Sequence, residues 1–436
     1  MKLTRNDNYK DSGVDWLGEI PSDWKVKRIK EFFCQISETG DVLEEKTYVP
    51  LENIESFTGR LIKKSSNENG EITNLFKKGD LLFNKLRPYL GKVIECQFDG
   101  GVSSEAIVLR VKNSLNSKVC LRYFFYRLLS TKFIFQVNSL TTGVKMPRTN
   151  PNVILALDIG YTIKKEQIKI ANFLDKKTSQ IDKKIILLQE KKETYEELKK
   201  SLINETICRG IDKNVELKDS GIEWIGKIPK HWKIERLKNI FDERVEKNLK
   251  LEGVPITDNI LSVMKDVGVI NHRDKGNVGN KMAEDITGYK LVHQRDIVVN
   301  KMNVLIGSVG ISKEFGALSV IYIILKTKSE GHPEYYDYVF RSKYFQRYLR
   351  TIATGILEIR EAVNSNLFRH QELPKPSKEE QIQIAKYLDE KTSNIDKTVS
   401  KINDQIETLK EFRKTLINDV VTGKVRIQDE WITFTR

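Results

Sequence analysis

The chain has 436 residues, and the usual size of about 100 to 200 residues per domain predicts several folded units. Hydrophobic residues make up 39% and charged residues 31%, which excludes a largely disordered chain and predicts folded domains with a strongly ionised surface. Lys and Arg exceed Asp and Glu by 14, which favours a polyanionic partner; a basic protein without such a partner is the plain alternative.

The cysteines and the apolar runs indicate the compartment. Cys34, Cys96, Cys120 and Cys208 are too far apart for a Cys-x-x-Cys pair or a disulfide framework, so we expect reduced thiols. The first residues lack the apolar core of a signal peptide. The longest apolar run, residues 320–325, is far shorter than the roughly 20 residues of a membrane span. We therefore expect a cytoplasmic protein.

The first distinctive segment, residues 11–33, is repeated later in the chain. It matches residues 219–241 at 12 of 23 positions without a gap. A second pair, residues 167–183 and 381–397, lies at a similar offset, so the chain reads as domain, helix, domain, helix. Repeats of this length and number do not suit a solenoid or a propeller. Each half is therefore expected to be a globular domain followed by a long helix.

Within each half, short β-prone runs precede an aromatic-rich helical stretch, a pattern that predicts an α+β domain with the aromatic residues in its core. In both halves, one of these β-prone runs leads into a loop through residues whose side chains are rich in hydrogen-bond donors. Asn suits contact with adenine, Arg suits guanine, and Lys suits phosphate, so we expect DNA contact here, with a solvated turn as the alternative. The candidates at this junction are Asn84, Lys85 and Arg87 in the first half and Asn300, Lys301 and Asn303 in the second.

A glycine followed by cations occurs near the end of each domain, in residues 142–148 and 354–360. Glycine lets the backbone approach a phosphate closely, although a turn leading into the next helix is the plain alternative. A basic loop in the second half has no counterpart in the first. The candidates in these three segments are Lys145 and Arg148, then Arg360, and then Arg273, Lys275 and Lys281.

Each long helix carries apolar residues at alternating steps of three and four, so each has a coiled-coil seam that needs a partner, most simply the other helix. Lys192, Lys199 and Arg413 interrupt the seams, and Ser377 with Glu380 predicts a capping box that begins the second helix. Both helices are nearly balanced in charge, so DNA contact is expected in the globular halves. The seam residues are Ile181, Ile185, Leu188, Tyr195 and Leu202, and then Ile395, Val399, Ile402, Ile406, Leu409 and Leu416.

Motifs for catalysis are missing from the sequence. There is no Gly-x-x-x-x-Gly-Lys-Ser/Thr loop, no Asn-Pro-Pro-Tyr-like motif and no Gly-x-Gly-x-x-Gly after a strand. The five histidines are scattered singly, which indicates no metal site. We therefore expect no catalytic residue and no bound cofactor or metal in this chain.

The duplicated opening DSG-x-x-W-x-G-x-IP-x-x-W, the strand motif GDLLFNKLRP and the duplicated EQI-x-IA-x-x-LD-x-KTS-x-ID together resemble the specificity subunit of type I restriction-modification systems. The resemblance covers about residues 11–423. It implies a non-catalytic subunit with two target-recognition domains, each reading one half of a bipartite, gapped DNA site. It also implies that the two helices pack antiparallel, with internal pseudo-twofold symmetry, as a ruler for the unread gap.

The resemblance further implies partners and their cofactors. Double-stranded DNA is the ligand, and two modification (methyltransferase) subunits dock on the helices. These subunits flip out the target adenine and use S-adenosylmethionine. Restriction (translocase/nuclease) subunits, which use ATP and Mg, join them to cleave DNA.

The expected boundaries are residues 1–163 for target-recognition domain 1, 164–212 for spacer helix 1, 213–376 for domain 2, 377–424 for spacer helix 2 and 425–436 for a C-terminal tail. The heptad from Ile181 to Ile207 would extend about 40 Å as a helix, or about 12 base pairs of DNA.

Three other functions remain open at this stage. They are a self-sufficient DNA methyltransferase or nuclease, an adaptor that uses its coiled coil, and an isolated repressor. A self-sufficient enzyme would need a further catalytic domain, for which 436 residues leave no room. Specific binding to duplex DNA would distinguish the specificity-subunit interpretation from the adaptor. Co-purification with a methyltransferase would distinguish it from the repressor.

Overall fold

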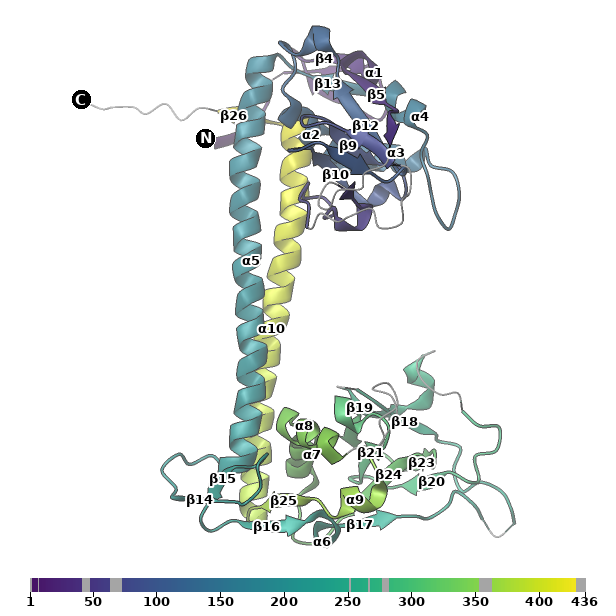
Figure 1. Ribbon diagram of the computed structural model, residues 1–436, viewed down its shortest axis with the longest axis vertical. Coiled ribbons are helices and arrows are strands. Elements are labelled where there is room, and N and C mark those ends of the chain that lie inside the picture. The colour runs from purple at the N-terminus through teal and green to yellow at the C-terminus, as the bar shows by residue number, and fades with distance from the viewer. Residues whose placement is uncertain are drawn as a thin grey trace, which may run out of the picture. The chain divides into compact units, whose positions relative to one another are not determined.

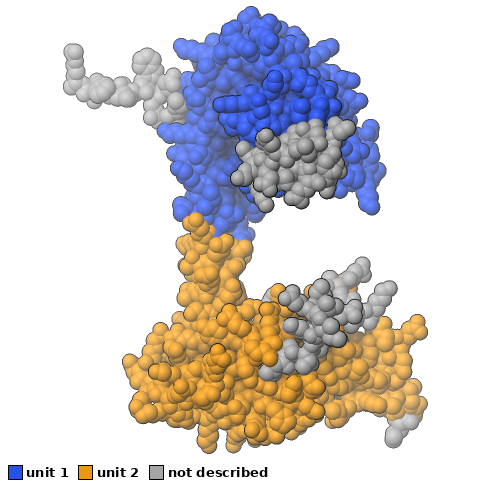
Figure 2. All heavy atoms as spheres, viewed as in Figure 1, with its two compact units in different colours: residues 1–189, 403–436 blue, residues 190–402 orange. Residues whose placement is uncertain are grey.

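The computed structural model describes residues 2–6, 8–40, 48–62, 73–250, 252–265, 267–276, 282–352 and 363–428. The chain divides into two compact units: residues 1–189 with 403–436 form unit 1, and residues 190–402 form unit 2 (Figure 2). Two long helices, α5 (Lys164–Arg209) and α10 (Lys378–Val421), each contribute a segment to both units (Figure 1). None of the described helices combines the length and the apolar composition that crossing a membrane requires.

The globular part of unit 1 is built on an antiparallel sheet with the strand order β10-β9-β12-β5. Its central strand β9 is buried on both faces: Leu82 packs against a second sheet, and the Phe83 ring lies 5.8 Å from Phe133 of a covering helix. This double burial explains a continuous apolar run without alternation. The strands are β5 (Phe33–Ile36), β9 (Leu81–Asn84), β10 (Val93–Glu95) and β12 (Ala106–Val111).

The second sheet of unit 1 has the order β6-β8-β11-β7, and its β11–β7 pair is parallel. Smaller pairs join β2 to β3, β4 to β13 and β1 to β26. These strands are β1 (Lys2–Arg5), β2 (Tyr9–Asp11), β3 (Glu19–Pro21), β4 (Lys25–Arg28), β6 (Thr39–Gly40), β7 (Tyr48–Val49), β8 (Thr73–Phe76), β11 (Gly100–Val102), β13 (Asp158–Tyr161) and β26 (Val425–Gln428). The helices are α1 (Ile29–Phe32), α2 (Leu121–Leu129), α3 (Thr131–Ser139) and α4 (Pro151–Ala156).

Unit 2 repeats the central sheet in the equivalent order β22-β21-β24-β17, but its second layer differs. In place of one four-stranded sheet it has two separate pairs, β18–β19 and β20–β23. The strands of these layers are β17 (Phe241–Arg244), β18 (Leu261–Met264), β19 (Gly268–Asn271), β20 (Lys290–Val292), β21 (Ile297–Asn300), β22 (Val309–Ile311), β23 (Gly316–Leu318) and β24 (Tyr322–Thr327). The pairs β14–β15 and β16–β25 comprise β14 (Leu217–Asp219), β15 (Lys227–Pro229), β16 (Lys233–Arg236) and β25 (Glu372–Lys375).

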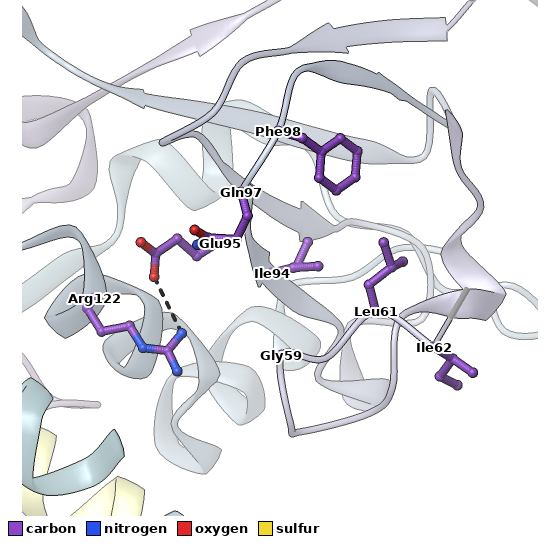
Figure 3. A pocket seen from close by; sticks show the side chains of 8 residues that line it. All are labelled: Gly59, Leu61, Ile62, Ile94, Glu95, Gln97, Phe98 and Arg122. Atoms are coloured by element: carbon purple, nitrogen blue, oxygen red, sulfur yellow. Dashed lines mark hydrogen bonds and ion pairs between the residues drawn. The ribbon is translucent and has the colours of Figure 1, made fainter. Parts of the chain in front are cut away.

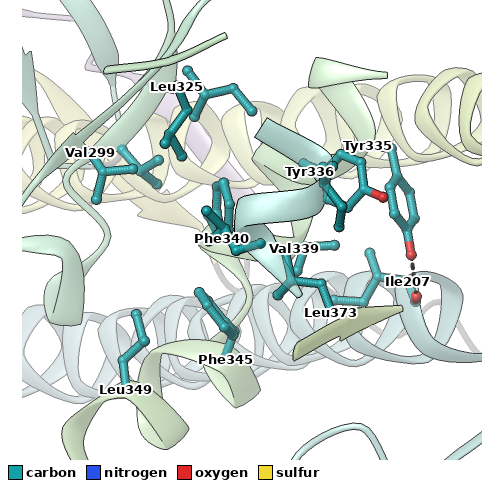
Figure 4. Packing of buried hydrophobic residues seen from close by; sticks show 14 of the residues in the cluster. Ile207, Val299, Leu325, Tyr335, Tyr336, Val339, Phe340, Phe345, Leu349 and Leu373 are labelled. Carbon is teal, nitrogen blue, oxygen red and sulfur yellow. Dashed lines mark hydrogen bonds between the residues drawn. The ribbon is translucent and has the colours of Figure 1, made fainter. Parts of the chain in front are cut away.

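Aromatic helices cover the central sheet of unit 2 and join it to the long helices. Phe340 and Phe345 pack between Val299 of the sheet and Leu373 of β25, and the Tyr335 hydroxyl donates to the Ile207 carbonyl of α5 at 2.8 Å (Figure 4). Most aromatic side chains of the two stretches are thus core, as predicted, whereas Phe135 and Tyr344 are exposed. The helices are α6 (Leu237–Ile240), α7 (Pro333–Arg341), α8 (Lys343–Ile352) and α9 (Ser365–Arg369).

The α+β fold class, with a duplicated domain and paired long helices, is confirmed. The predicted capping box of α10 is also present: Glu380 N–H donates to Ser377 Oγ at 3.3 Å, and Ser377 N–H donates to Glu380 Oε2 at 3.2 Å. In unit 1, β1 pairs with β26, and Asn6 Nδ2 donates to the Gly423 carbonyl at 2.6 Å. The first residues of the chain are therefore held against the end of α10.

Candidate nucleic-acid interface

The repeated motif around β9 and β21 begins with a buried carboxylate that is paired in each unit. Asp80 accepts two hydrogen bonds from Arg110, at 2.8 and 2.7 Å, and Asp296 accepts one from Arg244 at 2.6 Å. The two arginines come from different strands of the repeated sheet, β12 in unit 1 and β17 in unit 2. The aspartate of the motif therefore fixes the start of the central strand.

The asparagine that ends each central strand is occupied by its own turn. Asn84 Nδ2 donates to the Leu86 carbonyl at 2.6 Å, and its Oδ1 accepts from Leu86 N–H at 3.1 Å. Asn300 Oδ1 accepts from Met302 N–H at 3.0 Å. Both asparagines are buried, only 5% exposed. The geometry thus supports a turn-forming role for Asn84 and Asn300 and gives no support to their contact with bases.

The lysines that follow hold a second loop in both units. The Lys85 carbonyl accepts from Thr149 N–H at 3.0 Å, and the Lys301 carbonyl accepts from Val363 N–H at 3.0 Å. Both lysine side chains are half-buried. For Lys301, burial lowers the pKa of the ammonium, assisted by nearby Lys290 and opposed by Glu243. In unit 1 the junction therefore contacts the segment before α4, and in unit 2 it contacts the segment before α9.

Arg87 and Asn303 occupy corresponding positions in the two units but differ in backbone conformation and exposure. Arg87 has φ of 51°, a left-handed conformation that residues other than glycine seldom adopt, and its N–H donates to the Pro147 carbonyl at 2.7 Å. Its Nε is buried and has no hydrogen-bond partner within the described residues. Asn303 is exposed, with φ of −127°. The two side chains therefore start from different backbone conformations, and Asn303 is more exposed than Arg87.

The other candidate of unit 1 is a hairpin formed by residues 142–148. Thr142 and Arg148 form an antiparallel bridge in which each N–H donates to the other carbonyl at 2.9 Å. Arg148 also pairs with Glu105, with Nη2 to Oε1 at 2.8 Å and Nε to Oε2 at 3.0 Å. Lys145 is exposed at the tip. The structure therefore brings Lys85, Arg87 and Arg148 into one braced loop cluster.

The candidates in the basic loop of unit 2 are only partly described. Arg273 is exposed on a single 3-10 turn, His272–Lys275, which Asn271 caps by accepting from Arg273 N–H at 3.0 Å. Lys275 is half-exposed on the same turn. Lys281 and Arg360 lie outside the described residues.

The eleven predicted seam residues of the long helices are all buried or half-buried, so each unit contains an apolar seam. Two of the cations that interrupt the pattern pair across it. Arg413 Nε lies 3.0 Å from Asp182 Oδ1 in unit 1, and Lys199 Nζ lies 2.7 Å from Asp396 Oδ2 in unit 2. Asp182 precedes Lys199 in α5, whereas their partners follow the opposite order in α10, with Arg413 after Asp396, so the two helices run antiparallel.

The duplicated helix motif attaches each globular domain to its helix. Gln167 Oε1 accepts from Cys120 N–H at 2.8 Å, and Gln381 Oε1 accepts from His332 N–H at 2.7 Å, so each glutamine caps an aromatic helix. Sequence reasoning missed these contacts because the partners are 47 and 49 residues away.

A tyrosine completes the attachment in both units. The Tyr126 hydroxyl donates to Asp175 Oδ1 at 2.7 Å, and the Tyr338 hydroxyl donates to Asp389 Oδ1 at 2.7 Å. Burial raises the pKa of Tyr126 to about 12 and raises that of Tyr338 as well, so both hydroxyls remain protonated donors. The Asp of the duplicated motif therefore serves to dock the domain.

A pocket of about 700 Å³ opens in unit 1 beside β10 and α2 (Figure 3). At its edge, Arg122 lies 3.4 Å from Glu95, donates to Asp175 at 2.7 Å and stacks over the rings of Phe125 and Tyr126. These charges are paired with one another and join β10 to α2 and α5. The lining residues are Gly59, Leu61, Ile62, Ile94, Glu95, Gln97, Phe98 and Arg122.

No group of three or more His, Cys, Asp or Glu side chains within the described ranges is arranged to hold a metal ion.

The sequence is similar to a known family model and to known proteins. Residues 21–195 match the family model for the type I restriction modification DNA specificity domain. The chain is 24% identical to the type I restriction enzyme MjaVIII specificity subunit of Methanocaldococcus jannaschii over 456 residues, covering 98% of each chain.

Solved structures share the fold over almost the whole chain. The HsdS subunit from Thermoanaerobacter tengcongensis has a TM-score of 0.53 at 17% identity, covering 93% of this chain and 98% of its own. A chain from a type I R-M system complex has a TM-score of 0.68 at 16% identity, covering 93% and 99%. Over nearly its whole length the chain is therefore similar to type I restriction enzyme specificity subunits and shares the fold of the solved ones.

Proposed function

We propose that the chain selects DNA for a type I restriction-modification complex by reading a bipartite site, one half with each globular domain. The observation that carries this proposal is duplication combined with divergence. Both units have the same central sheet and the same glutamine and tyrosine contacts to a long helix, whereas their second layers differ. Two similar frameworks with different outer layers suit two readers of different half-sites.

The chain contributes recognition, and the chemistry belongs to partner subunits. In the proposed assembly, two modification subunits dock on the paired helices, and each uses S-adenosylmethionine to methylate an adenine that is flipped out of the duplex. Restriction subunits, which use ATP and Mg, translocate and cleave the DNA.

Phosphate contacts position such a reader and base contacts specify the sequence. In unit 1, Lys85 and Arg87 are the candidates for DNA contact beside the hairpin, because each holds a neighbouring loop through its backbone and each carries a half-buried cationic side chain. In unit 2, Arg273 and Lys275 present basic side chains on a capped turn. The overall excess of 14 positive charges supports attraction to DNA, since each phosphate contact releases counterions.

The gap between half-sites is proposed to depend on the helices. The helices α5 and α10 have 46 and 44 residues without a break, and each passes from one unit to the other. An ion pair crosses the seam in both units, which sets the register of the two helices. A fixed register supports a fixed gap.

The test uses the chain assembled with its modification subunit and a library of random duplexes. Bound duplexes are separated and sequenced at 0.15 M salt, because nonspecific binding weakens steeply with salt. We expect enrichment of two short sequences at one fixed separation. Enrichment of a single continuous motif, or of none, would contradict the proposal.

A further inference from the structure

Backbone and side-chain contacts hold the hairpin of residues 142–148 at several points. Its two ends are bridged at Thr142 and Arg148, and Gly143 turns the chain with φ of 89°. Two further contacts hold the hairpin to the domain: Arg87 N–H donates to the Pro147 carbonyl, and Arg148 pairs with Glu105. In Figure 1 the connection between α3 and α4, which contains this hairpin, projects from its domain.

This braced hairpin carries apolar side chains at its tip. Val144 is 102% exposed and Met146 is 49% exposed, and exposed Lys145 lies between them. Isolated exposed apolar residues are common on protein surfaces. Two of them on either side of a lysine, on a tip that backbone and side-chain contacts hold in place, are better explained by a ligand that is both apolar and anionic.

The charges select DNA as this ligand. Lys145 forms no ion pair in the described structure, and the hairpin itself contains no acidic residue. Glu105 is engaged by Arg148, so the net charge at the tip is positive. The major groove is about 12 Å wide, which admits a two-stranded ribbon, and its apolar feature is the 5-methyl group of thymine. A small cationic hairpin with apolar side chains matches both properties.

We propose that this hairpin enters the major groove of the half-site read by unit 1, where Val144 and Met146 contact thymine methyl groups and Lys145 contacts a phosphate. The inference rests on the proposed function and identifies specificity-determining residues within it. An adenine that is to be methylated pairs with thymine, so each methylated half-site contains at least one thymine for such a contact.

The test removes the methyl group from the DNA and the side chain from the protein. Once the motif is mapped, duplexes are made in which each thymine of the unit 1 half-site is replaced in turn by deoxyuridine, which lacks the methyl group. Affinities are measured by fluorescence anisotropy with the chain bound to its modification subunits. For the unaltered chain, at least one replacement is expected to weaken binding about fourfold, the effect of one buried methyl group.

The variants Val144→Ala and Met146→Ala are expected to bind the thymine duplex more weakly and to lose the difference between thymine and deoxyuridine at one position. Val320→Ala is the matched control, because Val320 is an exposed valine of unit 2. It is expected to keep the full difference. Because all three side chains are exposed, the melting temperatures of the variants are expected to stay close to that of the unaltered chain.

Three results would overturn the inference. One is an unaltered chain that binds its motif but is insensitive to every deoxyuridine replacement. Another is a pair of variants that keep the full sensitivity. The third is loss of the modification subunits from the variants, which would make the hairpin a protein-docking surface. By contrast, an unaltered chain that selects no gapped motif would refute the proposed function itself.

Discussion

Arg413 occupies a position that the heptad pattern reserves for an apolar residue, and the structure explains why a cation is found there. The side chain is 6% exposed and pairs with Asp182, which is 13% exposed. Its guanidinium also donates to the carbonyls of Phe57 and Thr58 in the globular part of unit 1. Lys199, the corresponding residue of α5, pairs with Asp396 at a more exposed site.

Replacing Arg413 with Ala is expected to lower the free energy of unfolding of unit 1 by about 3 kcal/mol, because it leaves a buried carboxylate and two carbonyls without their partner. Lys199→Ala is the matched control and is expected to cost under about 1 kcal/mol, since its pair is exposed to solvent. Urea unfolding followed by circular dichroism measures both. Equal costs for the two variants would refute this account of Arg413.

The lowered pKa of Glu380 predicts that the stability of the fold at the start of α10 depends on pH. Partial burial raises the pKa of this carboxyl, but hydrogen bonds from His231, Trp232 and the Ser377 backbone outweigh it and lower the pKa below 4.5. A carboxyl whose pKa is lowered by folding stabilises the fold above its unfolded pKa, and this contribution is lost as the pH falls through the folded value.

Glu380→Gln is therefore expected to lower the melting temperature of the chain at pH 7 but to have little effect near pH 3. The control is Glu166→Gln at the equivalent position of α5, where the described structure has no hydrogen bond from a Trp or His side chain. A loss for Glu380→Gln that is the same at both pH values would contradict this assignment.

At the scale of elements, the paired helices permit a deletion that preserves their register. Because Asp182 faces Arg413, residues 183–189 lie opposite residues 406–412 within unit 1. Removing both heptads shortens each helix by about 10 Å and keeps the apolar seam in phase. We expect the same two half-sites with a gap shorter by up to about 3 base pairs.

Methylation mapping with the assembled complex measures that gap. A deletion of residues 183–189 alone is the control, because it puts the two seams out of register and is expected to destabilise the helix pair. An unchanged gap in a folded double deletion would refute the role of the helices in spacing.

Periodicity was sufficient to predict these helices and their seam, because the apolar pattern directly reflects which face is buried. Contacts over a long sequence distance could not be predicted in this way. Nothing in the neighbourhood of Tyr126 indicates that its hydroxyl meets Asp175, 49 residues later. The role of the Asn84 amide is hard to predict for a similar reason, since a donor at a strand end is equally suited to base contact and to closing its own turn.

The hairpin tip gives a clearer example of what composition leaves out. Charge alone selects Lys145 and Arg148 as candidates, but Arg148 is engaged with Glu105 and braces the loop. Charge does not select Val144 and Met146, because apolar residues are ordinarily expected inside. Their signal in the sequence is that they lie between a glycine and a cation within a predicted turn.

At the scale of the whole molecule, duplication organises both units. The central sheet, the aromatic helices and the contacts to the long helices are repeated. The second layers of the two units, which we call the outer layers, have different strand topologies. Shared frameworks fit a shared role toward the helices, and different outer layers fit different half-sites. This division predicts that changes in one outer layer alter one half-site and leave the other half-site and the gap unchanged.

The most direct test of this account is a genome-wide map of methylated adenines by single-molecule sequencing. The map is made in cells that express the chain with its modification subunit and in matched cells that lack the chain. The account predicts a bipartite motif with a fixed gap in the first strain and its complete absence in the second. Methylation that is the same in both strains would contradict the claim that this chain selects the DNA.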